Sequence, residues 1–90
     1  MAGPDWKKDR LAGADLSRLN MLGRRYLNRG ETTALDEAAE YLALCANEEE
    51  ARQVRWWWNE GCRDYADSEE HLKELNQLLI DRSAELYPKN

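Results

Sequence analysis

Few residues in this 90-residue chain could do chemistry: two cysteines, Cys45 and Cys62, and a single histidine, His71. They make a poor zinc site, because three ligands without a CxxC or HxxxH spacing match no common zinc pattern. Two thiols in a helix-forming chain instead indicate small buried residues in a reducing compartment. A lone histidine in the first turn of a helix is a surface residue more often than a base, and no glycine-rich phosphate loop is present. We therefore expect a non-enzymatic protein with no catalytic residues, metal or cofactor.

Three tryptophans stand side by side in the stretch VRWWWNEG, residues 54–61. Adjacent side chains diverge by about 100° on a helix and alternate faces on a strand, so all three cannot enter one core. A helical projection predicts that Trp58 lies in the middle of the apolar face, Trp57 at its boundary, and Trp56 outward among charged residues. The apolar face of this helix is expected to hold Ala51, Val54, Trp58, Cys62 and Tyr65.

An outward Trp56 has three interpretations. It can stack on Arg52, one turn earlier, in a cation–π pair worth about 0.5–1 kcal/mol, or the first helix or the N-terminal arm can cover it. It can also anchor a protein interface, because Trp and Arg are enriched among residues that dominate binding energy. The protein-binding surface expected from this third interpretation comprises Arg52, Trp56, Trp57 and Arg63, beside the acidic cluster of Glu48, Glu49 and Glu50.

Helical periodicity predicts the elements that must position these residues. Residues 1–13 are expected to form an N-terminal arm, followed by helices at about 15–28, 34–46, 48–66 and 69–86. Leucines recur at helical spacing in the first and last of these, and no stretch alternates as a strand would. Amphipathic helices with short connections pack as antiparallel bundles. We therefore predict a single all-α domain, a small bundle of three to four helices.

Residues that favour helix ends support these boundaries. Thr33, with Asp36 three residues later, approximates a capping box. Asn47 before three glutamates suits a helix start, because a side-chain cap and negative charge both favour the N-terminal end of a helix. Ser68 repeats that signal, so the third and fourth helices are expected to be separate. Gly30 is expected to stop the first helix.

The net charge of −5 is unevenly distributed. Residues 1–30 carry seven Lys or Arg against three Asp or Glu, whereas residues 31–90 carry six against fifteen. A basic first helix can dock on an acidic remainder, or the acidic part can attract a cationic partner or imitate nucleic acid. The basic residues of the first helix that could instead touch nucleic acid directly are Arg18, Arg24, Arg25 and Arg29.

The segments LDEAAEYLALC and RWWWNEG resemble the helix-turn-helix of excisionase and MerR-like DNA-binding regulators, over residues 35–61. The resemblance implies a packing helix with Ala38, Ala39 and Leu42, and a recognition helix ending with Arg55, Trp56 and Gly61. This sequence departs from the pattern by about four extra residues between the halves. Its three glutamates would also stand where phosphates are contacted and would repel them. A DNA-binding regulator is therefore the alternative expectation.

The main expectation is a small acidic helical protein that binds another protein, including one in a nucleic-acid-handling complex. By size and charge it is similar to inhibitors or regulators of phages and mobile elements, of the anti-CRISPR, anti-restriction or immunity-like kind. A structural homo-oligomer, such as a homodimer through the Trp56 face, is a further alternative. No signal-peptide pattern and no run of about 18 apolar residues is present, so we expect a cytoplasmic protein that does not enter a membrane.

Overall fold

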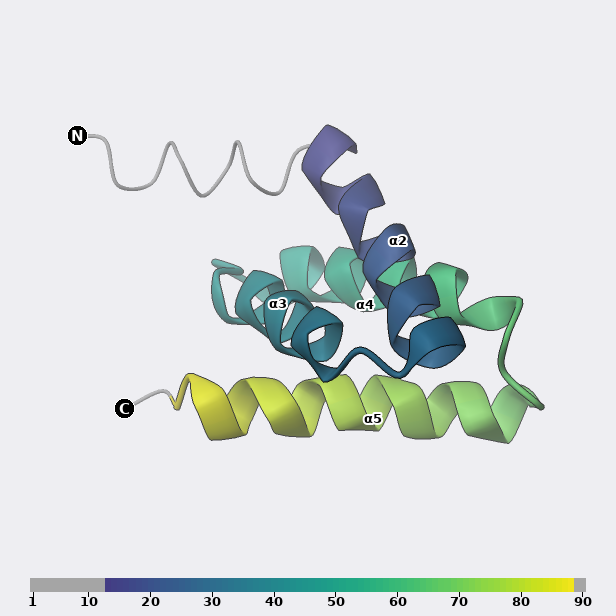
Figure 1. Ribbon diagram of the computed structural model, residues 1–90. Helices are drawn as coiled ribbons and strands as arrows, with labels where there is room; N and C mark the ends of the chain where they lie inside the picture. Colours follow the sequence, from purple (N-terminus) through teal and green to yellow (C-terminus); the bar gives the residue numbers. More distant parts are fainter. Residues whose placement is uncertain (1–12, 89–90) are drawn as a thin grey trace.

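The computed structural model describes residues 13–88, and the expectations for residues 1–12 lie outside this part. It contains four helices and no strand: α2 (Gly13–Arg29), α3 (Thr32–Ala43), α4 (Glu48–Arg63) and α5 (Glu69–Leu86) (Figure 1). The prediction of a small all-α bundle is confirmed. None of these four helices combines the length and the hydropathy needed to cross a membrane.

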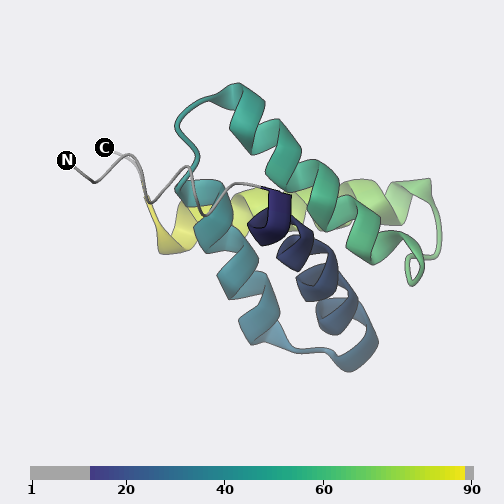
Figure 2. The same ribbon diagram turned by 90° about the horizontal axis from the view of Figure 1, so that it is seen from above.

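The most extensive helix contacts are between α2 and α4 and between α3 and α5. α2 and α3 lie side by side, joined by a short turn, and α4 packs chiefly against α2 (Figure 2). α5 crosses beneath the others and packs chiefly against α3, with further contacts to α4. The described part of the chain therefore has its core between the facing sides of all four helices.

The helix starts follow the capping signals in part. Asn47 caps α4, as predicted: its side chain accepts the Glu50 backbone N–H at 2.9 Å, while the Glu50 carboxylate accepts the Ala46 N–H at 2.7 Å. The predicted cap of α3 is wrong, because Thr33 lies inside the helix. Glu31 occupies the cap position and makes no side-chain capping bond. Packing of the apolar face therefore decides where α3 begins, rather than a cap.

Some helices end earlier than helical periodicity predicts. α2 stops at Gly30, as predicted, with a φ of 67° and an N–H bonded to the Tyr26 carbonyl at 2.9 Å. α3 ends at Ala43 rather than at 46, and α4 ends at Arg63 rather than at 66. The earlier end of α4 takes Tyr65 off the apolar face. Its side chain is 39% exposed, so its predicted place in the core is wrong.

The core is built from the apolar faces of all four helices, with Trp58 at its centre. Trp58 has no exposed surface, its indole N–H donates to the Leu75 carbonyl at 3.1 Å, and its ring lies 5.8 Å from that of Tyr26. The other buried residues with less than 2% exposure are Leu19, Leu22, Ala38, Ala39, Val54, Cys62 and Leu79. Leu86, the last residue of α5, is 39% exposed.

Two glycines let α2 and α4 cross at very short distance. A Cβ placed on Gly61 would lie 2.0 Å from the carbonyl oxygen of Asn20, and one placed on Gly23 would lie 2.9 Å from the carbonyl oxygen of Trp58. Both obstacles are backbone atoms, which cannot rotate away as a side chain can. Glycine is therefore required by the helix crossing at Gly61, although it lowers helix propensity there.

We expect Gly61→Ala to destabilise the protein by about 2–3 kcal/mol, because overpacking against the Asn20 backbone outweighs the gain of about 1 kcal/mol in helix propensity. Chemical denaturation measures the change. The control is Ala84→Gly at an exposed position of α5, which should cost about 1 kcal/mol from propensity alone. A Gly61→Ala protein as stable as the original, or more stable, would show that the helices do not meet this closely.

Candidate functional site

The three adjacent tryptophans occupy three different environments. Trp58 is buried, Trp57 is partly buried and packs against the core, and Trp56 is 55% exposed. The Trp56 ring meets the edge of Trp57 with centroids 5.2 Å apart and planes at 85°. Arg52 instead pairs with Glu49 at 3.1 Å. The aromatic neighbour of Trp56 is thus Trp57, and more than half of its surface is open to a partner.

The acidic cluster at the start of α4 is engaged within the same helix. Glu48 pairs with Arg55 at 2.8 Å, and the hydrogen bond from this guanidinium lowers the pKa of the Glu48 carboxyl. Glu49 pairs with Arg52, and Glu50 takes part in the capping described above. The cluster that we expected beside a binding surface therefore has local structural tasks, and its charge is partly compensated.

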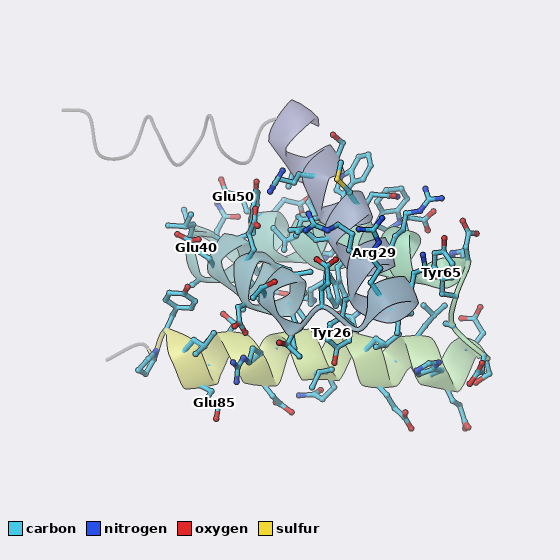
Figure 3. All side chains as sticks on the ribbon, viewed as in Figure 1. Tyr26, Arg29, Glu40, Glu50, Tyr65 and Glu85 are labelled. Carbon is cyan, nitrogen blue, oxygen red and sulfur yellow. The ribbon has the colours of Figure 1, made fainter. Side chains whose placement is uncertain are left out.

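A groove of about 490 Å³ runs between α2 and the carboxyl end of α4. It is lined by Ser17, Asn20, Met21, Arg24, Arg25, Asn28, Arg29, Trp57 and Tyr65. Three of these side chains are guanidinium groups, three are large apolar or aromatic groups, and none is acidic. Figure 3 shows Arg29 and Tyr65 at one end of the bundle, with Glu40 and Glu50 toward the other. We call this surface the α2–α4 groove.

The four arginines expected on one basic helix divide between two surfaces. Arg18 lies outside the groove and forms a bidentate ion pair with Glu37 of α3, which raises the pKa of the guanidinium. Arg25 binds Glu31 at 2.8 Å, and Arg29 lies 3.6 Å from the same carboxylate. Arg24 is exposed and has no ion pair with another residue of the range 16–88, where side chains are described. The positive charge of the three groove arginines is therefore only partly compensated by the Glu31 carboxylate.

The structure brings together residues from two rival expectations. Trp57 came from the protein-binding set and three arginines from the nucleic-acid set, yet all four line the α2–α4 groove, with Trp56 in edge contact with Trp57. Arg52 and Arg63 do not line it: Arg63 pairs with Glu60 at 3.2 Å and lies 3.6 Å from Glu69. The expected protein-binding surface is thus divided. Trp57 lines the groove and Trp56 contacts it, whereas Arg52 and Arg63 lie outside the groove.

Five of the nine groove residues were not predicted as site residues, and the two apolar or aromatic ones among them are Met21 and Tyr65. Met21 is 51% exposed and lies beside the leucine stripe of α2 rather than on it. An apolar residue out of phase with its helix was the available signal. Tyr65 could not be found this way, because its position depends on α4 ending at Arg63.

A second groove, of about 460 Å³, lies between the α3–α4 connection and the carboxyl end of α5. Its charged lining residues are Glu48 and Arg55, which pair with each other. Ile80 and Tyr87 contribute apolar surface. Because its charges are mutually satisfied, this groove offers less for recognition than the α2–α4 groove.

The chemistry-bearing residues stay apart. His71 is used in the start of α5, where its backbone N–H bonds the cap Ser68 at 3.2 Å and its Nδ1 accepts the Asp67 N–H at 3.0 Å. The Cys62 thiol is buried under α2, and burial raises its pKa to about 12. The Cys45 thiol contacts the Tyr41 carbonyl at 3.4 Å. Within residues 13–88, no group of three potential ligands is placed to hold a metal ion.

In comparisons with known proteins, no family model, no curated protein and no solved structure matches the chain significantly.

The different environments of the tryptophans predict different costs of truncation. Trp58→Ala should lower the free energy of unfolding by about 3–5 kcal/mol, because it opens a large cavity and removes the hydrogen bond to the Leu75 carbonyl. Trp56→Ala should cost less than about 1 kcal/mol, the range of an exposed aromatic pair. Denaturant titration of both variants tests this. Equal losses would mean that Trp56 is a core residue.

Thiol labelling should distinguish the two cysteines. Because burial raises the pKa of Cys62 from 9.0 to about 12, its thiol should react with a disulfide reagent near neutral pH only after unfolding, whereas half-buried Cys45 reacts faster. The stability contributed by a protonated Cys62 is complete below pH 9 and declines as pH rises toward 12, because the unfolded thiol ionises first. Cys45→Ser is the control and should remove the fast phase. Two equally fast thiols would contradict the buried placement.

Proposed function

We propose that this chain is a non-enzymatic protein-binding module whose contact surface is the α2–α4 groove with Trp56 at its rim. The best class is an inhibitor or regulator of the phage or mobile-element type, anti-CRISPR, anti-restriction or immunity-like, acting on a protein that can belong to a nucleic-acid-handling complex. This class rests on the small size and acidic balance of the chain. The binding surface rests on the composition and geometry of the groove.

One observation carries the proposal: exposed aromatic and apolar side chains gather with arginines around one groove. Met21 is 51% exposed, Trp56 55% and Tyr65 39%. Trp, Tyr, Met and Arg are the residues enriched at protein interfaces, and Trp, Tyr and Arg supply most binding hot spots. Scattered exposed apolar residues need no explanation, but a contiguous group beside a concave surface is typical of a contact site.

The groove is also held in place before any partner arrives. Its two walls are α2 and α4, whose spacing is set by backbone contacts at Gly23 and Gly61. Trp57 packs against the core, so its ring has little freedom to lose on binding. Preorganisation of this kind favours affinity because less side-chain entropy is lost on association.

A photo-crosslinking amino acid at position 21 tests the proposal in lysate of the native host. We expect it to capture a defined protein, and the added substitution Trp56→Ala should reduce capture while leaving the fold intact. The matched control places the crosslinker at position 77, on an exposed residue of α5 away from the groove, and should not capture that protein.

The competing functions give different products in the same experiment. Crosslinking of the chain to itself at position 21 would indicate a homo-oligomer. Capture that disappears after nuclease treatment would indicate nucleic acid. Equal capture from positions 21 and 77, or capture unaffected by Trp56→Ala, would refute the groove as the contact surface.

A further inference from the structure

We infer that the α2–α4 groove binds a short acidic segment of its protein partner, which places carboxylates on the arginines of α2 and an apolar side chain against Met21, Trp57 and Tyr65. This inference rests on the proposed function and specifies the partner's chemistry.

The charge of the groove favours an anionic occupant. Arg24, Arg25 and Arg29 line it, and the nearest compensating group is Glu31, shared by the last two. The carboxyl end of the α2 dipole opposes them with only about half a negative charge. About one and a half positive charges thus remain in excess, and Arg24 has no ion-pair partner within residues 16–88. A guanidinium binds a carboxylate in a two-bond geometry, which makes a carboxylate a specific occupant.

The dimensions favour a short segment. On α2 the groove extends from Ser17 to Arg29, a rise of about 18 Å along a helix axis. An extended peptide covers this length in about five or six residues. The volume of about 490 Å³ is that of a pocket for a few side chains. A loop or terminal segment fits these limits better than a flat domain surface does.

A polyanionic nucleic acid fits less well. Nucleic-acid affinity depends on neutralising many phosphates along a track, and the groove offers three arginines, two of them sharing a carboxylate. Arg18, which could extend the track, is engaged with Glu37 on α3. The exposed face of α5 carries Glu69, Glu70 and Glu74, which would repel a long phosphate backbone. A short segment can enter the groove and avoid that acidic face.

Amide chemical shifts of the full ¹⁵N-labelled chain test the inference with synthetic peptides. The probe is EEDLLEDE, and the controls are KKKLLKKK, in which the charge is reversed, and EEDSSEDE, which lacks the apolar residues. We expect the probe to shift amides of residues 20–29 and 57–65, the serine peptide to bind more weakly, and the lysine peptide to leave these residues unchanged. Added salt should weaken binding, because exposed charge pairs are screened.

A pair of arginine variants separates the groove charge from the overall charge. Arg24→Ala should weaken probe binding by about tenfold, as expected when one charge-assisted contact is lost. Arg18→Ala removes the same charge outside the groove and should leave affinity nearly unchanged. Circular dichroism of both variants checks that they remain folded. Equal effects of the two substitutions would mean that net charge alone drives binding, which would overturn the inference.

The remaining outcomes distinguish this inference from the function on which it rests. No shift in the groove with EEDLLEDE, or tighter binding there of a twelve-residue oligothymidine, overturns the acidic-segment inference. The proposed protein-binding function is judged separately, by partner capture at position 21. Capture that depends on Trp56 together with a failed peptide titration would retain the surface and reject the acidic occupant.

Discussion

The close crossing of α2 and α4 is the constraint on which the rest of the structure depends. Gly61 faces the Asn20 carbonyl and Gly23 faces the Trp58 carbonyl, each at distances that leave no space for a Cβ. This contact brings two backbones together where side chains would otherwise separate them. It also places the Cys62 thiol under α2, where burial raises its pKa to about 12 and leaves it a packing group rather than a nucleophile.

The same crossing creates the surface that we consider functional. Because the helices meet so closely, the arginines on the outer side of α2 lie beside Trp57 of α4 and beside Tyr65, two residues after the end of α4. The central position of Trp58 on the apolar face leaves its two predecessors only the boundary and the outside. One aromatic triplet therefore supplies a core residue, a wall of the groove and an exposed ring that contacts this wall.

Charge is used differently in the groove and elsewhere. On α4, glutamate–arginine pairs three and seven residues apart satisfy one another, as in Arg52 with Glu49 and Arg55 with Glu48. Pairs of this exposed kind contribute little stability, at most about 1 kcal/mol each. In the α2–α4 groove two of the three arginines, Arg25 and Arg29, share the Glu31 carboxylate. Surface charge that the fold itself does not satisfy is the part available for a partner.

The sequence by itself determined the helical class, the caps at Asn47 and Ser68, the stop at Gly30 and the environments of the three tryptophans, because each depends on local spacing or capping. It misplaced the start of α3, since packing overrides a weak cap. Only the tertiary structure decided that Met21 and Tyr65 join three arginines around one groove. That grouping depends on how closely and at what point two helices cross. Helical periodicity describes each helix alone and contains no information about its neighbour.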